Sequence, residues 1–245
     1  MYSIKMINTY NESTLHKTLK KIYSLEKTDK TEAEKDGFIF DIIKNENEII
    51  EIQTQNIGKL KTKIEYAIKN NLKIKIVIPI ITKKNIITTN NNEIISKRIS
   101  PKKENIYNLF KKIIGIHSFL SKENLTLEIL FLEITEHRIK LKEKTQSQNK
   151  KRRYKKDWIK TDKSLDKILS KTIFNKKEDY LKLLPKNIPQ EFSSKELKEL
   201  YKIENNNAKN INSQINAILW VLNKASFTEF LYKKDRLKYY KISQK

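Results

Sequence analysis

The sequence predicts an α/β domain, with a mixed sheet flanked by helices, followed by a second, mainly helical domain. Two observations predict this order. Between residues 37 and 81, apolar strands alternate with a basic helix, which is typical of a strand–helix–strand crossover. Beyond residue 164, helical spacing dominates until two aromatic strands follow near the end. The 245 residues are enough for one large or two small domains with buried cores.

The first elements are a helix and a hairpin. Apolar residues recur at helical spacing over residues 14–23, so we expect a helix there. Apolar runs on both sides of a polar turn at Lys44–Glu48 predict a β-hairpin over residues 37–54. Further along, we expect an amphipathic helix at 59–70, a strand at 73–81, a short hairpin around Asn90–Asn92, a helix from Pro101, and strands at 125–134 and 138–141.

Two carboxylates of this hairpin predict a metal site. With the turn at Lys44–Glu48, Asp41 lies across from Glu51, with the Cβ atoms about 5 Å apart. Like charges that face each other destabilise a sheet, and a divalent cation between them removes that cost. Mg²⁺ takes oxygen ligands from one or two carboxylates. Carboxylates that are simply solvated on an amphipathic sheet are the alternative.

The strand pair resembles the core of the PD-(D/E)XK nuclease superfamily. That fold is a mixed, restriction-endonuclease-like sheet flanked by helices, with an Asp on one strand and a (D/E)-x-K motif on the next. The resemblance implies that Asp41 and Glu51 hold Mg²⁺, and it suggests Glu12, on the first helix, as a third ligand. Since Glu12 precedes His16 by one helical turn, a plain Glu–His pair is the alternative for this residue.

Gln53 departs from the family pattern, because it stands where the family has its Lys. A neutral amide supplies no positive charge to activate water or to stabilise a transition state. The resemblance therefore assigns to Gln53 the positioning of water, and to a Lys of the following helix the missing charge. We select Lys61 for this role, with Lys59 and Lys63 as alternatives.

Several short motifs also resemble an uncharacterised prokaryotic family. They include Asp36-Gly37, Phe40-Asp41-Ile42-Ile43, Glu51-Ile-Gln-Thr54 and Gly58-Lys-Leu-Lys61. The resemblance covers nearly the whole chain and extends to a basic linker and a C-terminal winged helix. It implies an architecture rather than an activity.

A basic tract divides the chain. It contains Lys150, Lys151, Arg152, Arg153, Lys155 and Lys156, with Tyr154 and Trp158 interleaved and only Asp157 against them. Such a block is either a solvated linker or a phosphate-binding tract whose aromatic rings stack on bases. We therefore expect an α/β domain at 1–143, a linker at 144–163 and a second domain at 164–245.

The second domain has the element order of a winged helix-turn-helix. Short helices are expected at 165–174 and 177–184, and Ser193-Ser-Lys-Glu196 is a capping box that opens another. A longer helix at 208–224 then precedes strands at 228–232 and 237–242. Short helix, turn, longer helix and hairpin are the order of that fold, which binds either DNA or another protein.

The expected partner is nucleic acid, most simply DNA. The chain has 52 Lys and Arg against 29 Asp and Glu, a net charge of +23, although a Lys-, Asn- and Ile-rich composition is also typical of an AT-rich genome. The expected DNA-binding residues come from the basic tract, the long helix and the final turn: Lys151, Arg152, Arg153, Lys155, Lys209, Asn212, Ser213, Lys233, Lys234 and Arg236.

Composition excludes other classes. The absence of Cys excludes disulfides and thiolate metal sites. No apolar run reaches the roughly 20 residues that cross a bilayer, and no signal peptide is recognisable, so we expect a cytoplasmic location without membrane contact. A homodimer is compatible with both predicted folds. The sequence therefore predicts a DNA-binding protein with a Mg²⁺-dependent, nuclease-like domain, or else a non-enzymatic DNA-binding regulator that has kept only the fold.

Overall fold

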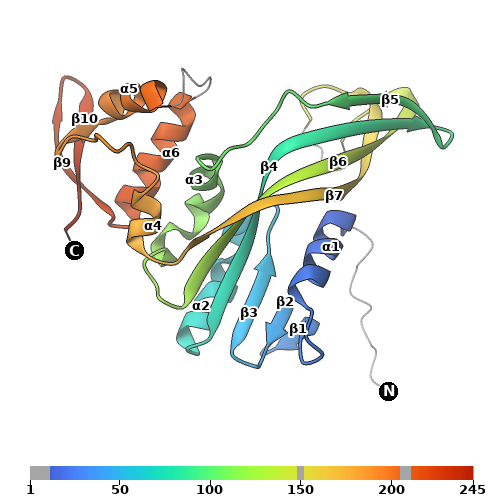
Figure 1. The fold of residues 1–245 in the computed structure, drawn as a ribbon, viewed down its shortest axis with the longest axis horizontal. Coiled ribbons are helices and arrows are strands. Elements are labelled where there is room, and N and C mark those ends of the chain that lie inside the picture. Colours follow the sequence, from blue (N-terminus) through green and yellow to red (C-terminus); the bar gives the residue numbers. More distant parts are fainter. Residues whose placement is uncertain (1–11, 148–151, 205–210, 245) are drawn as a thin grey trace. The chain divides into compact units, whose positions relative to one another are not determined.

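The computed structural model describes residues 12–147, 152–204 and 211–244 (Figure 1). The fold is mixed α/β, as predicted. One sheet has seven strands in the order β1-β2-β3-β4-β6-β7, with β5 paired to β4, and a second sheet has the order β8-β10-β9. The chain packs into two compact units. The first unit comprises Met1–Lys27, Ile81–Glu104 and Phe131–Ser170, and the second comprises Thr28–Ile80, Asn105–Leu130 and Lys171–Lys245.

The second unit begins with an antiparallel meander of β1 (Lys30–Lys35), β2 (Phe38–Lys44) and β3 (Glu48–Ile52). Lys44 pairs with Glu48, which confirms the predicted turn. The chain then crosses over through the 3₁₀ helix η2 (Ile57–Leu60) and helix α2 (Lys61–Lys69) to β4 (Lys73–Asn90), which runs parallel to β3. This confirms the predicted strand–helix–strand crossover.

Helices cover this part of the sheet because each has an apolar stripe. Ile64 and Ala67 of α2 are fully buried. Helix α3 (Asn108–Ile113) buries Leu109, Phe110 and Ile113, and the 3₁₀ helix η3 (Ile114–Phe119) buries Ile116 and Phe119. The predicted helix from Pro101 therefore begins only at Asn108. η2 and η3 touch through two glycines, and a Cβ atom on Gly115 would lie 2.6 Å from the Cα atom of Gly58.

Two strands are much longer than the sequence predicts, and a third was not predicted as a strand. β4 continues to Asn90, where a tight turn leads into β5 (Glu93–Ile99). β6 (Leu125–Thr145) joins the two strands predicted at 125–134 and 138–141, and β7 (Lys156–Phe174) follows it (Figure 1). The predicted helix at 165–174 is therefore wrong, and so is the linker at 144–163, whose described ends belong to β6 and β7. The sheet pairing of an edge strand overrides its helix-like apolar spacing.

The first unit also contains helix α1 (Thr14–Tyr23), which has the predicted bounds. Ser13 caps its N-terminus by accepting a hydrogen bond from the His16 N–H. The Thr14 N–H donates to Asp162 Oδ1 of β7 at 2.9 Å. None of the helices in the described ranges has the length and apolar character needed to cross a membrane.

The C-terminal part of the second unit contains α4 (Lys177–Leu181), β8 (Phe192–Ser193), α5 (Ser194–Glu204), α6 (Ile211–Lys224), β9 (Thr228–Lys234) and β10 (Leu237–Ile242). The capping box is confirmed, since Ser193 Oγ accepts from the Glu196 N–H and Glu196 Oε2 accepts from the Ser193 N–H at 2.7 Å. The segment is not mainly helical from residue 164, because residues 164–174 are strand.

Three of the hairpins share one kind of turn. β1–β2, β4–β5 and β9–β10 are each joined by two residues, namely Asp36-Gly37, Asn91-Asn92 and Asp235-Arg236. Both residues have positive φ in every case, between 46° and 79°. Type I′ turns require this backbone conformation, and their twist matches that of the flanking strands. The turns thereby hold each hairpin in register.

Candidate active site

The structure brings Asp41 and Glu51 together on neighbouring strands. The Asp41 N–H donates to Glu51 Oε1 at 3.3 Å, and the Ile52 N–H donates to Asp41 Oδ2 at 2.7 Å. The predicted facing of the two carboxylates is therefore confirmed. Glu51 is only 3% exposed, whereas Asp41 is half-buried. The pair therefore does not consist of two solvated surface carboxylates. A buried carboxylate needs a compensating partner.

That partner is Lys63 of α2. Its Nζ atom lies 2.7 Å from Glu51 Oε1 and 5.3 Å from the centre of the Phe40 ring. The predicted Lys61 is not brought to the pair, since its side chain is 58% exposed and lies 3.8 Å from Glu65 one turn along the helix. The positive charge expected from this helix is present, but it comes from the position two residues later.

Gln53 is turned toward the loop that follows β3. Its N–H donates to the Val77 carbonyl at 2.9 Å, and its Nε2 donates to the carbonyl of Gln55. No hydrogen bond within the described residues joins Gln53 to Asp41 or Glu51. Its visible role is to close the turn that leads into η2, and the assignment of Gln53 to water positioning remains a prediction.

The protonation of Glu51 is perturbed. Burial raises its pKa, the neighbouring Asp41 charge raises it further, and Lys63 opposes both, which leaves the pKa at about 7. The pair therefore holds a proton readily near neutral pH. A cation that binds here would have to displace this proton, so binding would strengthen as the pH rises.

Glu51 is expected to make stability depend on pH in a defined window. Its folded-state pKa lies above the ordinary value of 4.5, so the folded protein binds more protons between pH 4.5 and 7. The stabilisation is complete below pH 4.5 and is lost as the pH rises through 7. We expect Glu51 to lower the free energy of unfolding by roughly 3 kcal/mol across this window.

The measurement is denaturant unfolding at several pH values in EDTA, for the wild type and Glu51→Gln. The difference in free energy of unfolding between the two proteins should change steadily between pH 4.5 and 7 and level off beyond it. Parallel pH profiles would show that Glu51 titrates at an ordinary pKa.

Glu12 lies in the first unit, next to two basic groups. Its Oε1 contacts His16 Nδ1 and lies 2.7 Å from Lys20 Nζ. Burial alone would raise the pKa of Glu12, but hydrogen bonds from Lys20 and His16 lower it. This confirms the Glu–His pair. Within the described residues, no group of three His, Asp or Glu side chains is placed to hold a metal ion.

The predicted DNA-binding residues have different surroundings. Lys151 and Lys209 lie outside the described residues, as does the Asn212 side chain. Ser213 accepts a hydrogen bond from Lys111 of α3 at 2.8 Å, and the next residue, Gln214, donates to Asn105 and Asn108 at 3.2 and 3.3 Å. This end of α6 therefore packs against α3. The exposed predicted residues are Arg153, Lys155, Ser213, Lys233, Lys234 and Arg236, and of these Ser213 is the one bonded to α3.

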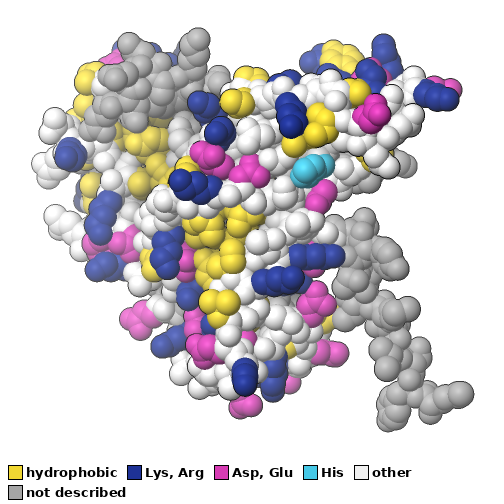
Figure 2. All heavy atoms as spheres, turned by 45° about the vertical axis from the view of Figure 1, so that its right-hand side comes forward, with side chains coloured by type: hydrophobic (Ala, Val, Ile, Leu, Met, Phe, Trp, Pro, Cys, Tyr) yellow, Lys and Arg dark blue, Asp and Glu magenta, His cyan; other side chains and the backbone are white. Residues whose placement is uncertain are grey.

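Arg152, which the sequence predicts as a DNA contact, lies in a pocket with two residues that the sequence did not predict, Glu136 and Arg138. Glu136 and Arg138 of β6 form this pocket together with Trp158 of β7. The sequence feature that could have identified Arg138 is the use of Arg in a chain whose basic residues are nearly all Lys. On the face drawn in Figure 2, Lys and Arg side chains are interspersed with Asp and Glu side chains. The positive surplus is thus not gathered into one basic area of that face.

Comparison with known proteins gives a family without a described activity. The family described as "Domain of unknown function (DUF8091)" matches residues 13–175. An uncharacterised protein of Treponema pallidum (strain Nichols) is 27% identical over 194 residues, which cover 78% of this chain and 73% of that protein. No solved structure matches.

Proposed function

The chain belongs to the DUF8091 family, whose name states no activity, and we propose from the site itself that the protein is a divalent-metal-dependent nuclease acting on DNA. The observation that carries the proposal is the trio of Asp41, Glu51 and Lys63. An Asp on one strand and a Glu on the next lie side by side, with the Glu carboxylate accepting a hydrogen bond from the Asp N–H, and a Lys contacts the Glu. The PD-(D/E)XK resemblance implies these three chemical groups, with the Lys supplied here by α2.

The donor set fits a hard divalent cation. Mg²⁺ is commonly held by one or two carboxylates and completes its coordination with water and substrate phosphate. Asp41 and Glu51 supply two such groups, so a third protein carboxylate is not required. When bound, Mg²⁺ would polarise a phosphate oxygen and lower the pKa of a coordinated water.

The side chains of this site have separable tasks. The Asp41 N–H donates to the Glu51 carboxylate and the Ile52 N–H donates to the Asp41 carboxylate, and these hydrogen bonds fix the orientation of both carboxylates. Lys63 holds Glu51 and places a positive charge where a phosphodiester gains negative charge during hydrolysis. The Phe40 ring under Lys63 limits its access to water, which strengthens this electrostatic effect.

The direct test is incubation of the purified protein with plasmid and linear DNA in Mg²⁺, Mn²⁺ or EDTA. We expect cleavage with metal and none in EDTA. Binding of DNA without cleavage under every metal condition would count against the proposal.

Lys63→Met is expected to reduce metal-dependent cleavage by about 10- to 100-fold, because it removes the group that orients a metal-binding carboxylate. Lys61→Met is the matched control, since it removes the same charge from the same helix at a residue that contacts Glu65 instead. Initial cleavage rates of the two variants show whether the loss is specific to Lys63. Equal losses would mean that the helix contributes only its general positive charge.

The C-terminal elements support the DNA part of the proposal. α5, α6 and the β9–β10 hairpin follow each other in the order of a winged helix-turn-helix, and we propose that they form one. Lys233, Lys234 and Arg236 are exposed at the hairpin turn, where phosphate contacts are expected. Because the first turns of α6 pack against α3, we assign DNA contact to the hairpin rather than to Ser213.

One observation favours a second function, that of a DNA-binding regulator without catalysis. Lys63 already compensates the Glu51 charge at 2.7 Å, so the pair can persist without any cation. This function predicts salt-sensitive DNA binding that neither Mg²⁺ nor Asp41→Asn changes.

A further inference from the structure

The first unit contains a pocket of about 410 Å³ that is separate from the carboxylate pair. It is lined by Glu136, Arg138, Ser147, Arg152, Trp158, Ile159 and Lys160, all of which belong to that unit. A volume of this size is within the range of small-ligand sites, which begins at about 300 Å³. The lining combines an aromatic ring with three basic side chains.

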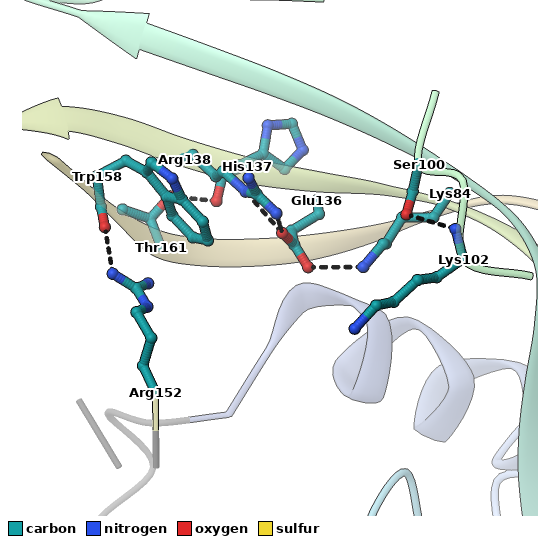
Figure 3. A network of polar contacts seen from close by, with 9 residues as sticks. All are labelled: Lys84, Ser100, Lys102, Glu136, His137, Arg138, Arg152, Trp158 and Thr161. Carbon is teal, nitrogen blue, oxygen red and sulfur yellow. Dashed lines mark hydrogen bonds and ion pairs between the residues drawn. The ribbon is translucent and has the colours of Figure 1, made fainter. Parts of the chain in front are cut away.

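Two arginines stack on the aromatic ring (Figure 3). The guanidinium carbon of Arg138 lies 3.6 Å from the centre of the Trp158 ring, and that of Arg152 lies 4.2 Å away. Arg152 also donates from Nη1 to the Trp158 carbonyl at 3.1 Å. Stacking fixes the plane of each guanidinium and leaves further N–H donors at its edge. Such a fork suits a phosphate group.

A buried carboxylate holds the first arginine in place. Glu136 is 6% exposed, and its Oε1 accepts from Arg138 Nε at 2.7 Å, while its Oε2 lies 3.3 Å from Lys84 Nζ (Figure 3). Burial alone would raise the pKa of Glu136, but the hydrogen bonds and charges of Arg138 and Lys84 lower it. Glu136 is therefore an ionised anchor whose charge is already matched.

The rest of the pocket carries uncompensated positive charge. Within the described chain, neither Arg152 nor Lys160 forms an ion pair with a carboxylate. These two charges belong to the lining of one pocket. An anion bound there would meet two basic side chains that no carboxylate of the described chain already neutralises.

The positions of the few arginines in this chain also support an anion-binding pocket. Lys accounts for nearly all of the 52 basic residues, and Arg occurs only at positions 98, 138, 152, 153 and 236. Two of these five side chains converge on one tryptophan. Lys cannot replace Arg in a stacked, bidentate site, so these are positions where the chemistry requires a guanidinium.

We propose that this pocket binds one unpaired nucleotide of a single-stranded nucleic acid, with its phosphate on Arg152 and Lys160 and its base beside the Trp158–arginine stack. The inference takes nucleic acid as the ligand from the proposed function and adds how the strand is held. A concave site of this size admits an unpaired nucleotide, whereas a base inside a duplex must first leave its stack to enter. Stacking and phosphate contact together are the usual means of holding single strands.

The test measures binding rather than cleavage, in EDTA, by fluorescence anisotropy of a labelled oligothymidine. Arg152→Gln should weaken binding about tenfold, and the slope of log affinity against log salt should become shallower by about 0.7. Arg98→Gln is the matched control, because it removes the same charge from an exposed arginine of β5 that does not line the pocket. It should weaken binding less than about threefold. Lys160→Gln, a second pocket variant, should resemble Arg152→Gln.

Three results would overturn the inference. Equal losses for Arg152→Gln and Arg98→Gln would show only diffuse electrostatic attraction. If the wild type does not bind the oligonucleotide, single-stranded nucleic acid is not the ligand of this pocket. Blunt duplex DNA bound as tightly, and as sensitively to Arg152→Gln, would exclude an unpaired nucleotide.

Tryptophan fluorescence tests whether the oligonucleotide binds in the pocket. The chain has two tryptophans, so Trp220→Phe leaves Trp158 as the only tryptophan emitter. Binding should change this emission in Trp220→Phe but not when Arg152→Gln is added at the same oligonucleotide concentration. An unchanged emission during saturable binding would put the strand elsewhere. Because every measurement is made without metal, these outcomes stand whether or not the protein cleaves DNA.

Discussion

Glu51→Gln is expected to reduce metal-dependent DNA cleavage about 1,000-fold. The amide keeps the shape of the side chain but removes the negative charge that would hold a divalent cation beside Asp41. It also removes the charge that binds Lys63, so two of the three site groups lose their positions together. Asp41→Asn is expected to cause a loss of similar size, and the double variant should be little worse than either, because residues that act as a unit are not additive.

The matched control for this prediction is Glu48→Gln on the same strand. Glu48 is ion-paired to Lys75 at 3.0 Å and its side chain is one-third exposed, so the variant makes the same chemical change outside the pair. Initial rates on plasmid DNA in Mg²⁺ and in Mn²⁺ provide the comparison. Full activity of Glu51→Gln, or an equal loss in Glu48→Gln, would refute the catalytic assignment.

Gly115→Ala is expected to destabilise the protein by about 3 kcal/mol. The added Cβ atom would lie 2.6 Å from the Cα atom of Gly58, and backbone atoms cannot turn aside as a side chain can. η2 would have to move away from η3, and α2 follows η2 directly in the chain. Because α2 carries Lys63, we also expect weaker cleavage from any fraction that folds.

Gly58→Ala distinguishes this contact from a general need for glycine. A Cβ atom on Gly58 would lie 3.5 Å from Gly115, which is ordinary contact, so a much smaller loss is expected. Denaturant unfolding of both variants measures the difference. Equal destabilisation would mean that the close approach is not what limits these positions.

The sequence was sufficient where the determining contacts are local. The facing of Asp41 and Glu51 follows from a hairpin whose turn and alternation lie within 20 residues, and the structure confirms it. The helix at residues 14–23 and the capping box at Ser193 also depend only on near neighbours.

The sequence was insufficient where the structure depends on which side of a helix faces the sheet, or on the position of a strand within the sheet. In the helix expected over 59–70, Lys63 precedes the buried Ile64 and contacts Glu51, whereas Lys61 is exposed and lies near Glu65. β7 is an edge strand whose residues 166–173 are nearly all exposed, so burial imposes no alternation on it. Its apolar residues then mimic helical spacing.

The two-residue turns described above have a consequence for the unfolded chain. The sequence has only three glycines, and of the six residues in these turns only Gly37 is one. Asn, Asp and Arg hold the other left-handed positions, at a small steric cost in the folded state. Each of these side chains also restricts the backbone of the unfolded chain more than glycine would, so less conformational entropy is lost when the hairpins form.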